Sequence, residues 1–88
     1  MTQHLTLTVT KRKFYNLVSS LGYDIFDFDF CTLSKQKNWY CLRTVAGDFT
    51  LTLFGGNVLL NRRVDGKLDN GLKLTLEQIE KYKLVKVA

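Results

Sequence analysis

Hydrophobic and polar residues alternate along much of the chain, most clearly over residues 48–64. Residues 49–53 read Phe-Thr-Leu-Thr-Leu, which is the two-residue period of a half-buried strand. Gly55-Gly56-Asn57 follows, and these residue types reach positive φ at low cost, as a tight hairpin turn requires. Residues 58–64 return as a second strand that ends on Arg62-Arg63. The pattern therefore predicts a β-hairpin, with Arg62 and Arg63 on opposite faces of its second strand.

Three other segments show the same alternation and are predicted to be strands: residues 4–10, 23–33 and 38–46. In the second, three phenylalanines occupy one face (Phe26, Phe28 and Phe30) and two aspartates the other (Asp27 and Asp29). In the third, Trp39, Cys41 and Arg43 share one side, and Tyr40 and Leu42 share the other. Residues 34–37 are predicted to form a polar turn, and Gly47-Asp48 to begin the next one.

The register of the 23–33 and 38–46 strands decides where the two cysteines lie. With three loop residues, Ser34 pairs with Asn38, and Cys31 lies across from Cys41. With four loop residues the cysteines fall on opposite faces, because the side-chain period is two. Both registers remain open, and in either case we expect free, structural thiols.

Two segments follow the helical period instead. Phe14, Leu17, Val18 and Leu21 recur at helical spacing between Thr10, a fair N-cap, and Gly22, so a helix is predicted over residues 11–21. Thr75 to Gln78 matches a capping box, which predicts a helix over 76–83 with Leu76 and Ile79 turned inward. Residues 65–71 are expected to form a loop, residues 72–74 a short extended piece, and residues 84–87 either more helix or a terminal strand.

These elements predict a single α+β domain spanning residues 1–88, in the order β-α-β-β-β-β-α, with two helices on one face of an antiparallel meander. The length of 88 residues supports one core, and a composition of 45% hydrophobic and 24% charged residues is ordinary for a globular protein. No run approaches the roughly 18 apolar residues of a membrane span. The alternating first residues do not resemble a signal peptide, and the two cysteines do not suggest a disulfide framework. We therefore expect a cytoplasmic protein without a membrane partner.

A net charge of +5 favours a polyanionic partner. The basic residues fall into three groups: Lys11, Arg12 and Lys13; Lys35, Lys37 and Arg43; and Arg62, Arg63 and Lys67. The first group lies at the start of a predicted helix, where cations oppose the helix dipole at a cost of about 0.3–1 kcal/mol each. It is interpreted either as a basic tip for phosphate or an acidic protein, or as a solvated charge run.

Residues suited to catalysis or to holding a cofactor are scarce. The chain has one histidine, His4, and its two cysteines are ten residues apart, so there is no metal-ligand motif of the Cys/His kind. Asp27 and Asp29 alone are too few to make a dedicated cation site. Gly55-Gly56 lies between strands rather than before a helix, unlike a phosphate-binding loop. We expect no enzyme activity, no cofactor and no metal.

Part of the chain resembles a WGR domain, a small β-rich module associated with DNA-binding proteins. The resemblance covers residues 38–71 and rests on Asn38-Trp39-Tyr40, on Leu53-Phe54-Gly55-Gly56, on Val58-Leu59-Leu60 with Arg62, and on Gly66-Lys67-Leu68. The tryptophan that gives the family its name falls at Asp65, so the family's DNA contact is not carried over to that position.

Three functions follow from these observations. The first is a small module that binds nucleic acid through the basic residues of the first helix tip and the hairpin. The second is a protein-binding adaptor, or an inhibitor of the kind that phage and mobile elements encode. It would act through a sheet edge or through exposed aromatic residues among Trp39, Tyr40 and Phe54. The third is a homodimerising domain that pairs at an edge such as residues 4–10.

Overall fold

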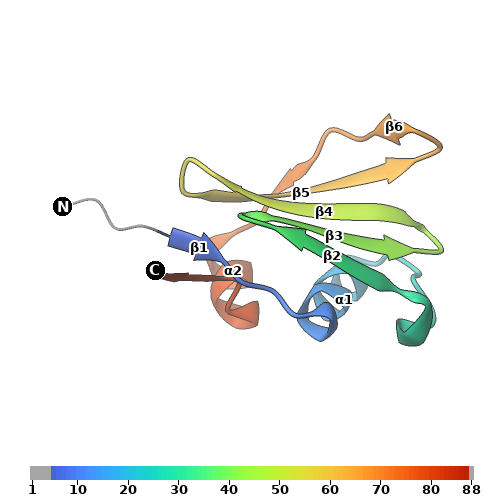
Figure 1. Ribbon diagram of the computed structural model, residues 1–88, viewed down its shortest axis with the longest axis horizontal. Helices are drawn as coiled ribbons and strands as arrows, with labels where there is room; N and C mark the ends of the chain where they lie inside the picture. The colour runs from blue at the N-terminus through green and yellow to red at the C-terminus, as the bar shows by residue number, and fades with distance from the viewer. Residues whose placement is uncertain (1–4, 88) are drawn as a thin grey trace.

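The computed structural model describes residues 5–87, in which two α-helices cover one face of an antiparallel sheet (Figure 1). The elements along the chain are β1 (Leu5–Leu7), α1 (Lys11–Ser20), the 3₁₀-helix η1 (Phe28–Phe30), β2 (Thr32–Gln36), β3 (Trp39–Thr44), β4 (Gly47–Phe54), β5 (Asn57–Val64), β6 (Lys67–Leu68), β7 (Leu72–Lys73), α2 (Leu76–Tyr82) and β8 (Val85–Val87). This arrangement confirms the predicted α+β class and the meander of strands. No helix among the described residues is long and apolar enough to cross a membrane.

The main sheet is a meander in which β2, β3, β4 and β5 pair in sequence order. The outer edge of β5 pairs with two short strands, β6 near its end and β7 near its middle. β1 and β8 form a separate antiparallel pair, with Leu5 across from Val87. The predicted strand over residues 4–10 is therefore shorter than expected, and His4 lies outside the described residues. Residues 85–87 form a strand rather than more helix.

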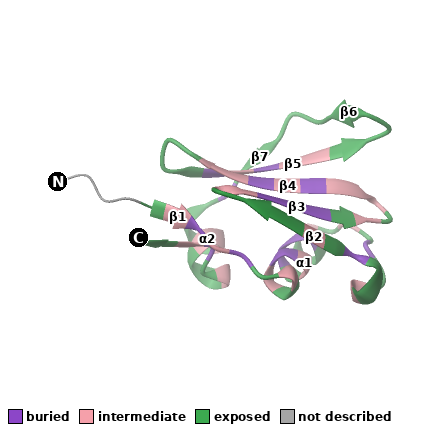
Figure 2. Cartoon of the chain, viewed as in Figure 1, coloured by how far each residue is buried: buried purple, intermediate pink, exposed green. Residues whose placement is uncertain are grey.

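Buried residues lie on the central strands and on α1 (Figure 2), and their apolar side chains make one core. The strands contribute Tyr40, Leu42, Phe49, Leu51, Val58 and Leu60, and α1 contributes Phe14, Leu17 and Val18. Each fully buried side chain of this kind stabilises the fold by roughly 1.5–3 kcal/mol relative to leaving it exposed. The apolar face of the alternating strands thus packs against the apolar face of the helix that the sequence pattern predicted.

Local signals place the ends of the central hairpin and of both helices. The turn between β4 and β5 is Gly55–Gly56, and both residues have positive φ, at 58° and 79°. Thr10 caps α1 by accepting a hydrogen bond from the Lys13 amide, at 3.1 Å. Thr75 and Gln78 form both hydrogen bonds of the capping box of α2. Leu76, expected to turn inward, is 78% exposed because it lies in the first turn on the solvent side.

The strand predicted over residues 23–33 is wrong for most of its length. The Asp27 carboxylate accepts a hydrogen bond from the Asp29 amide at 3.0 Å, and the Phe30 amide bonds to the Asp27 carbonyl at 3.1 Å. These bonds close a 3₁₀ turn, which competes with a strand because an Asx side chain offers the backbone a local partner. Phe26 and Phe30 are exposed rather than aligned on a buried face.

Two predicted turns are also displaced. β2 continues to Gln36, and the turn is Lys37–Asn38, with Asn38 at a φ of 56°. Ser34 therefore lies across from Cys41, so the turn is shorter than in either register considered. The cysteines nevertheless fall on opposite faces, as the four-residue alternative predicted: Cys31 belongs to the core, whereas Cys41 lies on the sheet face away from it. The next turn is Val45–Ala46, and Gly47 already belongs to β4. The Thr44 hydroxyl closes this turn, because it donates to the Gly47 carbonyl and accepts from the Ala46 amide. Both cysteines are free thiols, as predicted.

Candidate nucleic-acid interface

One face of the main sheet has no helix over it, and we call it the open face. Because the register is regular, its side chains form three rows across the strands. The first row is Thr32, Arg43, Asp48, Arg63 and Leu68; the second is Ser34, Cys41, Thr50 and Asn61; the third is Gln36, Trp39, Thr52, Leu59 and Lys73. The centre of the open face is a shallow hollow of about 380 Å³, lined by residues of all three rows.

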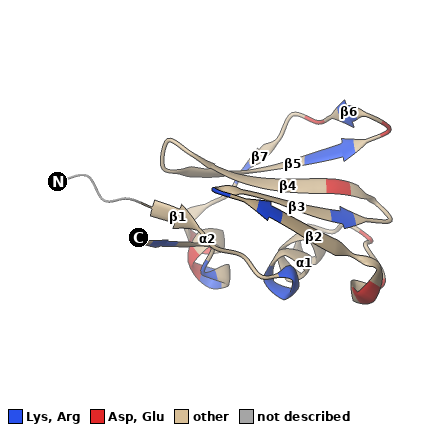
Figure 3. Ribbon diagram, in the orientation of Figure 1, with Lys and Arg blue, Asp and Glu red and all other residues tan. Residues whose placement is uncertain are grey.

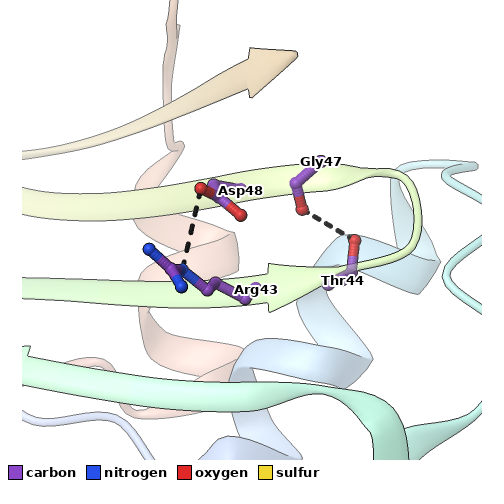
Figure 4. Close-up of polar contacts among 4 residues, drawn as sticks. All are labelled: Arg43, Thr44, Gly47 and Asp48. Atoms are coloured by element: carbon purple, nitrogen blue, oxygen red, sulfur yellow. Dashed lines mark hydrogen bonds and ion pairs between the residues drawn. The ribbon is translucent and has the colours of Figure 1, made fainter. Parts of the chain in front are cut away.

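The first row places one carboxylate between two guanidinium groups. Asp48 lies directly across from Arg43 on one side and from Arg63 on the other, and Figure 3 shows basic segments of β3 and β5 beside an acidic one in β4. Arg43 Nε is 3.9 Å from Asp48 Oδ2 (Figure 4), and the two side chains are 74% and 38% exposed. An exposed pair of this kind contributes about 0–1 kcal/mol. Asp48 cannot neutralise both arginines, so the row keeps a net positive charge, to which Lys73 in the third row adds.

The second and third rows supply uncharged groups. Cys41 is buried beneath the hollow, flanked by the polar side chains of Thr50 and Ser34. Burial raises the pKa of the Cys41 thiol, and nearby Asp48 acts in the same direction, while Arg43 and Arg63 partly offset the shift. The thiol is therefore protonated at neutral pH, and it is a poor nucleophile.

Of the three aromatic residues singled out from the sequence, Trp39 alone lines this hollow. It is half-buried, in the third row. Tyr40 belongs to the core, 8% exposed, and its hydroxyl donates to the Leu7 carbonyl at 3.3 Å. Tyr40 is therefore removed from the candidate contacts. Phe54 is 78% exposed at the end of β4, beside the Gly55–Gly56 turn.

The two arginines at the end of β5 have different surroundings, as their alternation predicts. Arg63 is exposed on the open face. Arg62 turns to the helix side, where its Nε donates to the Ala46 carbonyl at 2.8 Å. Its Cζ lies 5.1 Å from the centre of the Tyr23 ring and 5.8 Å from that of Phe49. Arg62 is therefore a packing residue, and Arg63 is the one available to a partner.

The basic group at the start of α1 is divided in the same way. Lys11 Nζ is 4.3 Å, and Arg12 Cζ 3.8 Å, from the centre of the Phe28 ring. Such contacts are worth about 0.5–1 kcal/mol at exposed sites, which offsets the cost of placing cations at a helix N-terminus. Lys13 instead borders a separate shallow hollow with Lys83 and Lys86. Packing against Phe28 therefore accounts for Lys11 and Arg12 without a bound partner.

The remaining basic candidates lie apart from the hollow. Lys35 lies across from Tyr40, so it belongs to the sheet face that the helices cover, although it is exposed at the sheet edge. Lys37 is in the β2–β3 turn, and Lys67 lies across from Val64. Four further members of the open face were not predicted from the sequence: Thr50, Thr52, Asn61 and Lys73. Strand alternation contained the signal for the two threonines, but the pairing of β7 with β5 was needed to place Lys73.

Among residues 5–87, no group of three or more His, Cys, Asp or Glu side chains is arranged to hold a metal ion. Comparisons with protein-family models, with curated proteins and with solved structures found no match to this chain. The resemblance to a WGR domain thus remains a prediction.

Proposed function

We propose that this chain is a non-enzymatic module that binds single-stranded nucleic acid across the open face. The observation that carries the proposal is the register, which brings Trp39, Arg43 and Arg63 around one hollow on a sheet face that no helix covers. The resemblance of residues 38–71 to a WGR domain points to the same broad class of partner.

The side chains of the open face suit the two parts of a nucleotide. Arg43 and Arg63 present guanidinium groups that bind phosphate oxygens. Trp39 offers a ring on which a base can stack, and hydroxyl and amide groups of Thr50, Thr52 and Asn61 can hydrogen-bond to base edges. The first and third rows are four residues apart along each strand, or about 13 Å. The arginines and Trp39 would therefore contact different nucleotides of one strand.

The shape of the open face favours a single strand over a duplex. Direct readout of a duplex requires a helix or a β-ribbon that enters a groove. The residues here line a hollow in a sheet, and Trp39 does not project beyond its neighbours, since it is half-buried. A base can reach such a ring only when it is unpaired.

Trp39 is the single tryptophan of the chain, so its fluorescence reports directly on the proposed site. We expect single-stranded DNA or RNA oligonucleotides to quench it at about 50 mM salt, with an affinity that falls steeply as salt is added. Arg43→Ala and Arg63→Ala should each weaken binding and lower the slope of log K against log salt by about 0.7. Lys81→Ala is the matched control, because it removes one exposed positive charge from α2.

Two results would overturn the proposal. One is the absence of quenching by any oligonucleotide at low salt. The other is an equal loss of affinity in Lys81→Ala and Arg63→Ala, which would reduce binding to nonspecific attraction by the net charge. A duplex that binds as tightly as either of its strands would overturn the preference for single strands.

A further inference from the structure

The loop between α1 and β2, residues 21–31, exposes two phenylalanines. Phe26 is 69% exposed and Phe30 is 76% exposed, whereas Ile25 and Cys31 of the same loop are buried. Large apolar side chains exposed on one short loop are candidates for an interaction surface.

The exposure does not result from a loose loop. Phe28 packs edge-on against Tyr15, with ring centres 5.3 Å apart, beneath Lys11 and Arg12. The Tyr15 hydroxyl donates to the Phe26 carbonyl, and the 3₁₀ turn fixes Asp27 relative to Phe30. The backbone at Phe26 and Phe30 is thus held in place while their side chains stay out of the core, and an ordered backbone loses less entropy on binding.

Charges of both signs lie on this loop and against Phe28, the phenylalanine between these two in the sequence. Asp24, Asp27 and Asp29 are exposed on the loop, and Lys11 and Arg12 contact Phe28 from the first turn of α1. Within residues 5–87 the only ion pair is Arg43–Asp48, so the carboxylates of the loop and the cations of α1 do not pair with each other. In a two-fold interface residue i of one copy meets residue j of the other and j meets i, so a surface that carries both cations and carboxylates can pair them with those of a second copy.

We propose that the α1–β2 loop is the interface of a homodimer. Phe26 and Phe30 of one copy pack against the same residues of the other, and Arg12 of each copy faces Asp29 of its partner. The interface involves one loop and one helix turn, so it falls in the small, reversible class of protein contacts. It does not depend on the nucleic-acid proposal, because none of these residues belongs to the open face.

Sedimentation velocity of the full chain between about 10 and about 500 µM, which covers dissociation constants of a weak complex, tests the proposal. We expect the mass to rise from monomer toward dimer with concentration, and Phe26→Ala/Phe30→Ala to remain monomeric throughout. Phe54→Ala is the matched control: it removes a phenylalanine of similar exposure, 78%, from the hairpin tip, and should dimerise normally. Circular dichroism should show all three proteins folded, since the substituted rings are exposed.

A charge exchange tests the two-fold arrangement itself. Arg12→Asp and Asp29→Arg should each weaken the dimer at least tenfold, and the two substitutions together should restore it, because each copy then presents the exchanged pair. A wild-type chain that stays monomeric up to about 500 µM overturns the proposal. So does dimerisation that Phe54→Ala abolishes and Phe26→Ala/Phe30→Ala leaves intact.

Discussion

Adjacent residues of this chain can have unrelated tasks, and Arg62 and Arg63 are the clearest case. Arg62 is fixed by a hydrogen bond to the Ala46 carbonyl and by two aromatic rings, whereas Arg63 is exposed on the open face. Arg62→Ala should therefore lower the free energy of unfolding by about 1–3 kcal/mol. Arg63→Ala should change it by less than about 0.5 kcal/mol. Urea unfolding measures both, and equal losses would show that Arg63 has a packing role as well.

The two buried thiols make stability depend on alkaline pH. Burial raises the pKa of both Cys31 and Cys41 above the ordinary value of 9.0. The folded state therefore holds these protons more tightly than the unfolded chain, and stability is lost as pH rises above about 9. The test therefore compares two proteins over the same pH range. Between about pH 8 and about pH 10.5, a range that spans the ordinary thiol pKa, Cys31→Ala/Cys41→Ala should lose less stability than the wild type. If the stability of both proteins falls equally over this range, the loss does not come from the two thiols.

At the scale of elements, the glycines of the turns are not equivalent. A Cβ on Gly47 would lie 2.8 Å from the Arg63 carbonyl oxygen and 2.9 Å from Val64 Cγ2, at a φ of 116°. Gly55 has no atom within 4 Å of a Cβ, at a φ of 58°. Gly47→Ala should therefore destabilise the protein by about 2–4 kcal/mol, and Gly55→Ala by about 1 kcal/mol. Thermal unfolding compares them, and a reversed order would mean that the β4–β5 pairing near Gly47 relaxes freely.

Elements whose period and end signals agree could be predicted from the sequence. The hairpin of residues 48–64 combines clean alternation with a two-glycine turn, and α1 combines an apolar stripe with Thr10 and Gly22 at its ends. Residues 23–31 alternate just as clearly but do not form a strand. Their conformation depends on the Asp27 side chain and on packing of Phe28 against α1. The alternation of apolar and polar residues carries no information about either contact.

The candidate interface was less predictable than the fold, because it depends on register across four or more strands. Alternation alone separates Arg62 from Arg63 and places Trp39 with Arg43. It does not show that Asp48 lies between Arg43 and Arg63, since that requires the β3–β4 and β4–β5 registers together. A displacement of the turn by one residue reverses the faces, and the actual turns differ from the expected ones.

At the scale of the whole molecule, the open face and the α1–β2 loop are made of different residues and should act separately. Phe26→Ala/Phe30→Ala should bind oligonucleotides with the affinity per chain of the wild type, and Arg63→Ala should dimerise with the wild-type dissociation constant. Fluorescence titration and sedimentation on the same samples measure both. A loss of both properties in either variant would mean that binding and dimerisation are coupled.

The pairing of β1 with β8 joins the two ends of the described chain, and it has a mechanical consequence. Leu5 lies across from Val87 and Leu7 across from Val85, so residues 5 and 87 meet at the same end of an antiparallel ladder. Tension applied between those residues would break the ladder one hydrogen bond at a time, as in unzipping, instead of shearing all of its bonds together. Under an optical trap the two ends should detach at low force, before the meander from β2 to β5 yields.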